Sequence, residues 1–166
     1  MSSGKPIIKQ ISWFSVIAQI LLVFLLIKFL EFLNFSSNNS LIITWVIFVS
    51  AALFLRNTIA RHHRKGMRLV RAGKYKEAIL EFEKSLEFFS KYSWVDKLRF
   101  ITILSSSRIT YKEMALVNIA FSYTQIGKGK LAKEYYEKAL ELFPDSQIAK
   151  SALNMILSVE NSSKES

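Results

Sequence analysis

Two hydrophobic runs joined by a short polar loop dominate the first third of this sequence. The first covers residues 11–33 and is interrupted near its end by Lys28 and Glu31. The second covers residues 41–56. A helix needs about 20 residues to cross the hydrocarbon core of a bilayer. Each run therefore predicts a membrane-spanning helix, the second with help from bilayer thinning or from residues 57–60.

Positive charge flanks these runs and predicts their orientation. The net charge is +10, and residues 1–76 carry 11 of the 23 Lys and Arg but only one of the 13 acids. The loop, residues 34–40, has no charge. By the positive-inside rule, both termini face the cytoplasm and the loop lies outside, and we expect a bacterial cytoplasmic membrane. The residues expected at anionic lipid headgroups are Arg56, Arg61, Arg64, Lys65 and Arg68.

Three other interpretations compete with this topology. The apolar runs are also compatible with a shallow hairpin that does not cross the bilayer. A cleaved signal peptide is disfavoured because the first run is long and no small-residue cleavage motif follows it. A nucleic-acid surface is disfavoured because the excess charge sits beside the apolar runs, where the positive-inside rule already accounts for it.

A self-comparison of the remaining chain finds one internal repeat, with an offset of 54 residues. At this offset small residues align with small residues, and an aromatic residue aligns with an aromatic residue. The matched pairs are Gly66 with Ala120, Gly73 with Gly127, Ala78 with Ala132, and Phe82 with Tyr136. Small residues allow two helices to approach closely, and the aromatic side chains fill the space around each contact.

This block resembles the tetratricopeptide repeat, a helix–turn–helix unit of about 34 residues. Residues 113–146 fit the family pattern closely, with Pro144 where the second helix should stop. Residues 57–90 fit it in their second half only. His62 and Lys65 stand where the family prefers a bulky aromatic residue and a leucine. We expect the helix of these early turns to run out of the second span without packing on a neighbour.

The predicted fold class is all-α: a transmembrane hairpin followed by a small helical-repeat domain. Residues 91–112 are expected to form an inserted helix and a turn, with Trp94, Leu98, Ile101 and Leu104 on one face. That helix either fills the core between the repeats or lies at the membrane interface. The outer segments are a cytoplasmic N-terminus (1–10), a capping helix (147–159) and a disordered tail (160–166).

The sequence offers no catalytic, metal-binding or cofactor-binding constellation. His62 and His63 are adjacent, so on a helix they point about 100° apart and cannot bind one metal from the same face. The stretch 127–130, GKGK, lacks the spacing of a phosphate-binding loop. No cysteine is available for a disulfide or a thiolate site. We therefore predict a non-enzymatic protein without a cofactor.

The resemblance implies that first helices of the repeats line a concave surface that binds a protein partner. The candidate residues are Met67, Val70, Arg71, Asn118, Phe121, Ser122 and Gln125. The alternative is that Val70 and Phe121 pack on the inserted helix and close the groove. Clamping of a C-terminal carboxylate is disfavoured, because His63 and Met67 replace the Lys and Asn that the family's clamp uses.

Two functions remain open from the sequence. The preferred one is a membrane-anchored scaffold that recruits or steadies a protein partner at the cytoplasmic face of the membrane, without nucleic acid. The other is an accessory subunit of a transport or envelope-biogenesis complex, acting mainly through its spans.

Overall fold

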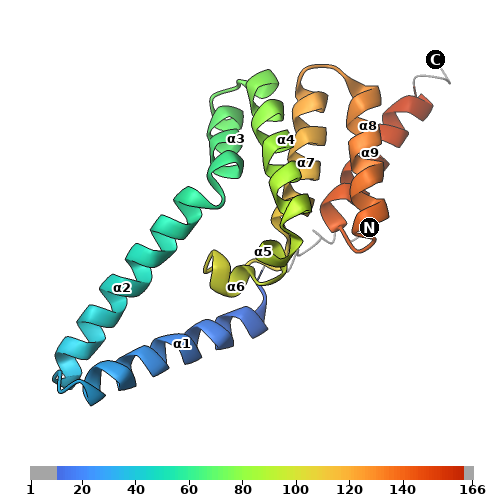
Figure 1. Ribbon diagram of the computed structural model, residues 1–166. Coiled ribbons are helices and arrows are strands. Elements are labelled where there is room, and N and C mark those ends of the chain that lie inside the picture. The colour runs from blue at the N-terminus through green and yellow to red at the C-terminus, as the bar shows by residue number, and fades with distance from the viewer. Residues whose placement is uncertain (1–10, 163–166) are drawn as a thin grey trace. The chain divides into compact units, whose positions relative to one another are not determined.

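The computed structural model describes residues 11–162, and all of its regular elements are helices (Figure 1). The all-α helical-repeat prediction is confirmed. The predicted N-terminal segment 1–10 and the last four residues of the predicted tail lie outside the described residues. The described chain forms two compact units. The hairpin unit comprises residues 11–61 and 94–108, and the repeat unit comprises residues 62–93 and 109–162.

The hairpin unit is built on two long apolar helices, α1 (Trp13–Phe32) and α2 (Ser37–Thr58). At about 1.5 Å per residue, their 20 and 22 residues extend about 30 and 33 Å. Ser12 caps α1 by accepting a hydrogen bond from the Ser15 backbone N–H. Asn34 adopts a left-handed conformation (φ 65°), which allows the tight turn into α2.

Small polar side chains lie in the contact between α1 and α2. Ser40 and Thr44 of α2 are fully buried. Residues four apart lie on one helix face, and small side chains there let two helices approach closely without a large apolar core. Most bulky apolar residues of both helices remain exposed, whereas Leu30 of α1 is buried.

Two short helices, α5 (Ser93–Lys97) and α6 (Arg99–Thr102), replace the single inserted helix that the sequence predicted. Apart from Ser93 they belong to the hairpin unit. Leu98 separates them, and Leu104 then adopts a left-handed backbone conformation (φ 49°) that ends the helical run. The prediction of one amphipathic face is wrong here, because Leu98 and Ile101 are exposed whereas Leu104 is buried.

The repeat unit consists of five helices that stack side by side in chain order (Figure 1). They are α3 (Arg61–Arg71), α4 (Tyr75–Lys91), α7 (Tyr111–Gln125), α8 (Gly129–Leu142) and α9 (Gln147–Ser162). A turn at residues 59–60 separates α2 from α3. The helix that was expected to leave the membrane unpacked is therefore a separate element, and its His63 and Gly66 are buried.

The C-terminal part of the repeat unit follows the predicted order of elements. Thr110 caps α7 by accepting a hydrogen bond from the Glu113 backbone N–H at 3.1 Å. Ser146 caps α9 in the same way, accepting from the Ala149 N–H at 3.4 Å. The helix α9 continues to Ser162, three residues beyond the predicted end of the capping helix.

Two apolar clusters hold the five helices together. The first is centred on α4 and α7, with Ala78, Phe82 and Ile119 at 0% exposure. The second joins α7, α8 and α9 through Leu116 and Tyr136. Leu86 and Tyr135 pack against both clusters, so the core is continuous across the repeat unit.

Candidate protein-interaction surface

The two repeat copies share the same turn geometry between their helices. Gly73 and Gly127 have φ values of 72° and 73°, a left-handed conformation that strains any side chain. The backbone hydrogen bonds also recur at the offset of 54. They are Gly73 N–H to Val70 O, Lys74 N–H to Leu69 O, Gly127 N–H to Thr124 O, and Lys128 N–H to Tyr123 O. The repeat therefore holds at the level of individual backbone bonds.

Close contact between the paired helices requires a small residue in each copy. A Cβ atom on Gly66 would lie 2.7 Å from the Phe82 ring, which is fully buried. Ala120 and Tyr136 occupy the corresponding positions of the second copy, and both are buried. The small residue of each first helix thus makes room for the aromatic ring of its second helix.

The insertion between the copies leaves the stack of repeats intact. Phe89 near the end of α4 and Tyr111 at the start of α7 stack with ring centroids 4.8 Å apart and an interplanar angle of 17°. The His63 ring packs edge-on against Tyr111 at 5.1 Å and tilted against Phe82 at 5.5 Å. These rings bring the two ends of the insertion together, so α4 and α7 pack as consecutive helices would.

His63 is a buried imidazole inside this aromatic contact. Its exposed fraction is 7%, and within the described part of the chain its Nδ1 has no hydrogen-bond partner. Burial lowers the pKa of His63 from 6.5 to about 4, because the charged form would lose its hydration. The side chain is therefore neutral at physiological pH and serves as a packing element.

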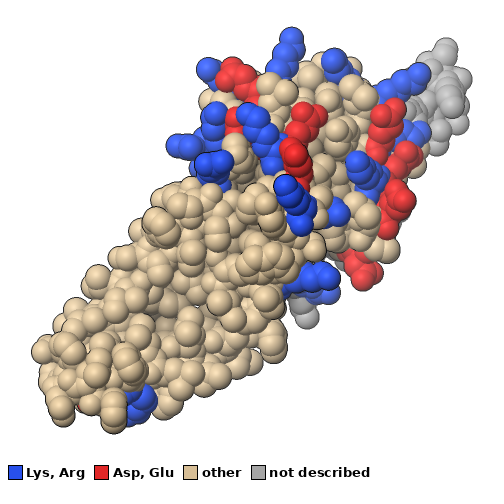
Figure 2. Space-filling model, viewed as in Figure 1, with Lys and Arg blue, Asp and Glu red and all other residues tan. Residues whose placement is uncertain are grey.

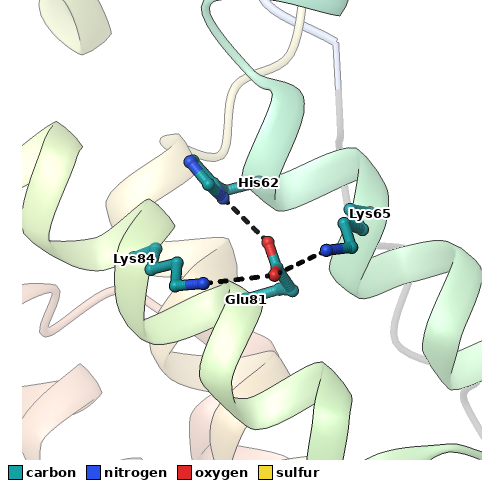
Figure 3. A network of polar contacts seen from close by, with 4 residues as sticks. All are labelled: His62, Lys65, Glu81 and Lys84. Atoms are coloured by element: carbon teal, nitrogen blue, oxygen red, sulfur yellow. Dashed lines mark hydrogen bonds and ion pairs between the residues drawn. The ribbon is translucent and has the colours of Figure 1, made fainter.

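A charged network centred on Glu81 also joins α3 to α4 (Figure 3). The Glu81 carboxylate accepts hydrogen bonds from His62 Nδ1 at 2.8 Å, Lys65 Nζ at 2.9 Å and Lys84 Nζ at 3.4 Å. Its burial alone would raise the pKa, but the hydrogen bonds from His62 and Lys65 and the charges of Lys65 and Lys84 lower it to about 2. Glu81 is therefore ionised and fixes the register of the first helix on the second.

The predicted partner-binding residues divide into packed and exposed groups. Met67 and Val70 pack against the cluster around Phe82 and are half-buried. Ser122 is fully buried and donates its hydroxyl hydrogen to Asn118 O at 2.7 Å, so it offers no contact surface. The first-helix surface, as we use the term below, consists of the exposed Arg71, Phe121 and Gln125 with the half-buried Asn118.

Phe121 and its neighbour Tyr75 mark the apolar part of the first-helix surface. Phe121 is 37% exposed and contacts the Tyr75 ring edge-on at a centroid distance of 6.2 Å. Tyr75 begins α4 and is half-buried. The ring contact with Phe121 shows that Tyr75 borders the candidate surface.

The residues predicted to lie at lipid headgroups also differ in their surroundings. Arg56 donates from Nη2 to Leu104 O at 2.6 Å and from Nε to Ile103 O at 3.4 Å, so its guanidinium is engaged within the hairpin unit. Lys65 pairs with Glu81. The other three residues of this set, Arg61, Arg64 and Arg68 of α3, are exposed.

No group of three or more His, Cys, Asp or Glu side chains in residues 11–162 could hold a metal ion. The two histidines have separate roles, since His62 bonds to Glu81 and His63 packs between rings.

Comparison with known families supports the repeat. Residues 115–146 match the tetratricopeptide repeat. The match covers most of α7, all of α8 and the turn into α9, so it supports the second copy as a tetratricopeptide repeat. None of the curated proteins matches the chain. The tetratricopeptide fold is typically a non-catalytic scaffold for protein–protein interaction.

Proposed function

We propose that the chain is a membrane-anchored scaffold whose repeat unit binds a protein partner at the cytoplasmic face of a bacterial cytoplasmic membrane. The observation that carries this proposal is the combination of a tetratricopeptide repeat with two long helices whose apolar side chains are exposed. The proposal excludes nucleic acid as the partner. It involves no cofactor and no catalysis.

The exposure of the hairpin supports a membrane location over a water-soluble core. Only 11% of the most apolar part of each helix is buried within the protein. In α1 the exposed side chains include Ile17, Ile20 and Leu25, and in α2 they include Val46 and Phe54. A soluble protein rarely exposes an apolar surface of this extent, because each apolar Å² left in water costs about 25 cal/mol.

The distribution of charge agrees with the same location. Between Trp13 and Thr58 the only charged residues are Lys28, Glu31 and Arg56. Lys28 and Glu31 form an ion pair with an Nζ–Oε2 distance of 2.8 Å near the loop end of α1. Figure 2 shows that the visible face of the two helices is otherwise uncharged. Charge is thus confined to the ends of the hairpin, where it would reach water.

The first-helix surface supports the interaction half of the proposal. Phe121 offers a partly exposed ring, Asn118 and Gln125 lie three and four residues from it on the same helix, and Arg71 adds a positive charge at the end of α3. An exposed aromatic residue within a polar rim is typical of small protein-binding sites. Anchoring raises the effective concentration of a membrane-bound partner, so a small surface suffices.

Site-specific photocrosslinking in native membranes tests this function. A photoreactive amino acid at Gln125 should give adducts with another protein, whereas the same group at the exposed Glu137 of α8 should not. Both positions are exposed and lie on neighbouring helices, so Glu137 controls for random collision. Equal adducts from both positions, or none from Gln125, would contradict a role for the first-helix surface.

A further inference from the structure

The segment between the two repeats, residues 94–108, is bound to both apolar helices of the hairpin unit. Ser12 at the start of α1 donates its N–H to Ser106 O at 2.8 Å, and Gln19 of α1 donates to Phe100 O at 3.2 Å. The Phe14 and Phe100 rings pack edge-on at 5.7 Å. Arg56 at the end of α2 completes the attachment through Ile103 O and Leu104 O. The segment therefore closes the open end of the hairpin, away from the 33–36 turn.

Many carbonyl groups in the irregular backbone of this segment accept hydrogen bonds from within the hairpin unit. The Arg99 guanidinium donates to Asp96 O, Ser107 O and Arg108 O at 2.8–2.9 Å. Thr102 Oγ1 donates to Val95 O at 2.7 Å. With the bonds from Ser12, Gln19 and Arg56, eight carbonyls outside ordinary helix bonding have donors. In a bilayer, non-helical backbone is tolerated only where such groups are satisfied by protein.

In this segment several large apolar side chains are exposed while some charged side chains are buried, which is the reverse of the pattern in a loop of a water-soluble protein. Three large apolar residues are exposed, with Trp94 at 58%, Leu98 at 45% and Ile101 at 56%, whereas Val95, Ile103 and Leu104 are buried. Of the charged residues, Asp96 is buried and Arg99 is half-buried, which leaves only Lys97 and Arg108 exposed. Tryptophan and lysine together are typical of the membrane interface, where a lysine extends its charge to water.

The lengths of the apolar helices place this segment at bilayer depth. Gln19 lies six residues inside α1, about 9 Å from Trp13 along the helix axis. From Ile20 to Phe32, α1 provides about 20 Å of apolar length, and residues 41–55 of α2 provide about 22 Å. The hydrocarbon core is about 30 Å thick. The rest of the thickness of the hydrocarbon core is therefore spanned by residues 13–19 of α1, and Phe100 contacts α1 at this level.

We propose that residues 94–108 form a third membrane element, embedded in the bilayer at the open end of the hairpin with Trp94, Leu98 and Ile101 against the lipid. This inference rests on the proposed function, since it requires that α1 and α2 span the membrane. The partner of this apolar surface is the bilayer, because the segment is hydrogen-bonded to the two helices whose exposed apolar side chains face the same lipid. The chain then passes from the membrane elements to the repeat unit after Arg61 and after Arg108, and it returns to the membrane before Trp94.

Cysteine accessibility in the full chain tests the proposal. The chain has no cysteine, so single substitutions can be read without background. The full-length protein is reconstituted in vesicles of phosphatidylethanolamine and phosphatidylglycerol and treated with a charged, membrane-impermeant maleimide. The test variants are Leu98→Cys and Ile101→Cys. The hairpin controls are Phe24→Cys and Leu53→Cys, and the aqueous control is Ser151→Cys on α9, exposed in the structure.

The proposal predicts that Leu98→Cys and Ile101→Cys react about tenfold or more slowly than Ser151→Cys, because an apolar environment suppresses the thiolate. Fast labelling at 98 and 101 with protected hairpin controls would overturn this inference and leave the anchor standing. Fast labelling at Phe24→Cys and Leu53→Cys would overturn the membrane anchor itself.

Tryptophan quenching separates lipid from protein as the cause of slow labelling. A Trp13→Phe, Trp45→Phe variant retains Trp94 as its one tryptophan. Lipids brominated near the headgroup end of the acyl chain should quench its emission strongly, and iodide in the water should quench it weakly. Emission that responds to iodide and not to brominated lipid would overturn the proposal, whatever the labelling rates.

Discussion

The guanidinium of Arg56 donates a hydrogen bond of 2.6 Å to the carbonyl oxygen of Leu104, 48 residues further along the chain. Leu104 is buried and holds a left-handed backbone conformation, which costs about 1–2 kcal/mol for a residue with a Cβ atom. A bond from a charged donor offsets that cost. Arg56, expected at lipid headgroups, therefore fastens the inserted segment to the hairpin.

Replacing Arg56 separates this bonding role from its charge. Arg56→Gln should release residues 94–108 by removing a charged hydrogen bond worth about 1.5–3 kcal/mol. Trypsin should then cleave the detergent-solubilised protein faster at Lys97, Arg99 and Arg108. Arg56→Lys keeps the charge but loses the two-pronged donor, so it should show an intermediate rate. A wild-type rate for Arg56→Gln would show that the bond does not hold the segment.

Two glycine substitutions test the packing of the first repeat copy, and a third, in the second copy, serves as the control. Gly66→Ala should destabilise the protein by about 1–3 kcal/mol, because the new Cβ would lie 2.7 Å from the Phe82 ring. Gly73→Ala should cost about 1–2 kcal/mol through its positive φ alone, since nothing lies within 4 Å. Gly129→Ala, also without a contact, should be neutral or slightly stabilising. Thermal unfolding followed by circular dichroism measures all three.

The test compares the sizes of the destabilisation caused by the three substitutions. If Gly66→Ala matched Gly129→Ala, the close approach of α3 to α4 would be wrong. The same result would remove the packing evidence that residues 62–91 form a repeat-like helix pair, and the turn at Gly73 would be its remaining support, because that copy lies outside the family match.

Glu81→Gln should destabilise the repeat unit more than an exposed ion pair would. The carboxylate is 7% exposed and accepts from three cationic or polar side chains, so its neutral replacement should cost about 1.5–3 kcal/mol at neutral pH. Glu77→Gln is the matched control: Glu77 and Lys74 are each 58% exposed at 3.6 Å, and such pairs are worth under about 1 kcal/mol. Equal effects in urea unfolding would contradict the network's role.

Acid should weaken the fold in two successive ranges of pH, which overlap between 4.5 and 4. His63 has a pKa of about 4 when folded against 6.5 as its ordinary value, so the unfolded chain binds more protons between these values. Its contribution is fully present above pH 6.5 and is lost as the pH falls to 4, by up to about 3 kcal/mol. Glu81, with a folded pKa of about 2, loses its contribution only between pH 4.5 and 2.

The His63→Leu variant isolates the upper range. A leucine fills a similar volume between Phe82 and Tyr111 and cannot be protonated, so the loss of stability between pH 6.5 and 4 should shrink relative to wild type. The measurement is the free energy of unfolding at several pH values. An unchanged slope would show that His63 is not the group responsible.

Local patterns in the sequence were enough to predict the all-α fold and the second repeat copy. Gly127 and Pro144 are short-range signals, because each marks a turn at the end of one helix. The offset of 54 repeats contacts that each lie within one helix pair. The buried histidine was not predictable, because His63 is enclosed by α4 and by Tyr111, 48 residues further on.

The inserted segment shows why helical periodicity failed there. Trp94, Leu98 and Ile101 are spaced for one face of a helix, which predicted a buried stripe. The backbone instead follows the donors that Arg56, Gln19 and Arg99 direct at its carbonyls. Periodicity cannot report contacts with residues 47–81 positions away, nor can it tell whether an apolar face meets protein or lipid.

The most direct test of the account joins location and binding in one measurement. Cells expressing the full chain with a photoreactive residue at Gln125 are irradiated, and their membranes are washed at alkaline pH before analysis. We predict that the chain stays in the washed membrane pellet and carries an adduct with another protein that the Glu137 control lacks. Release of the chain into the wash, or the same adducts from both positions, would contradict the membrane-anchored scaffold.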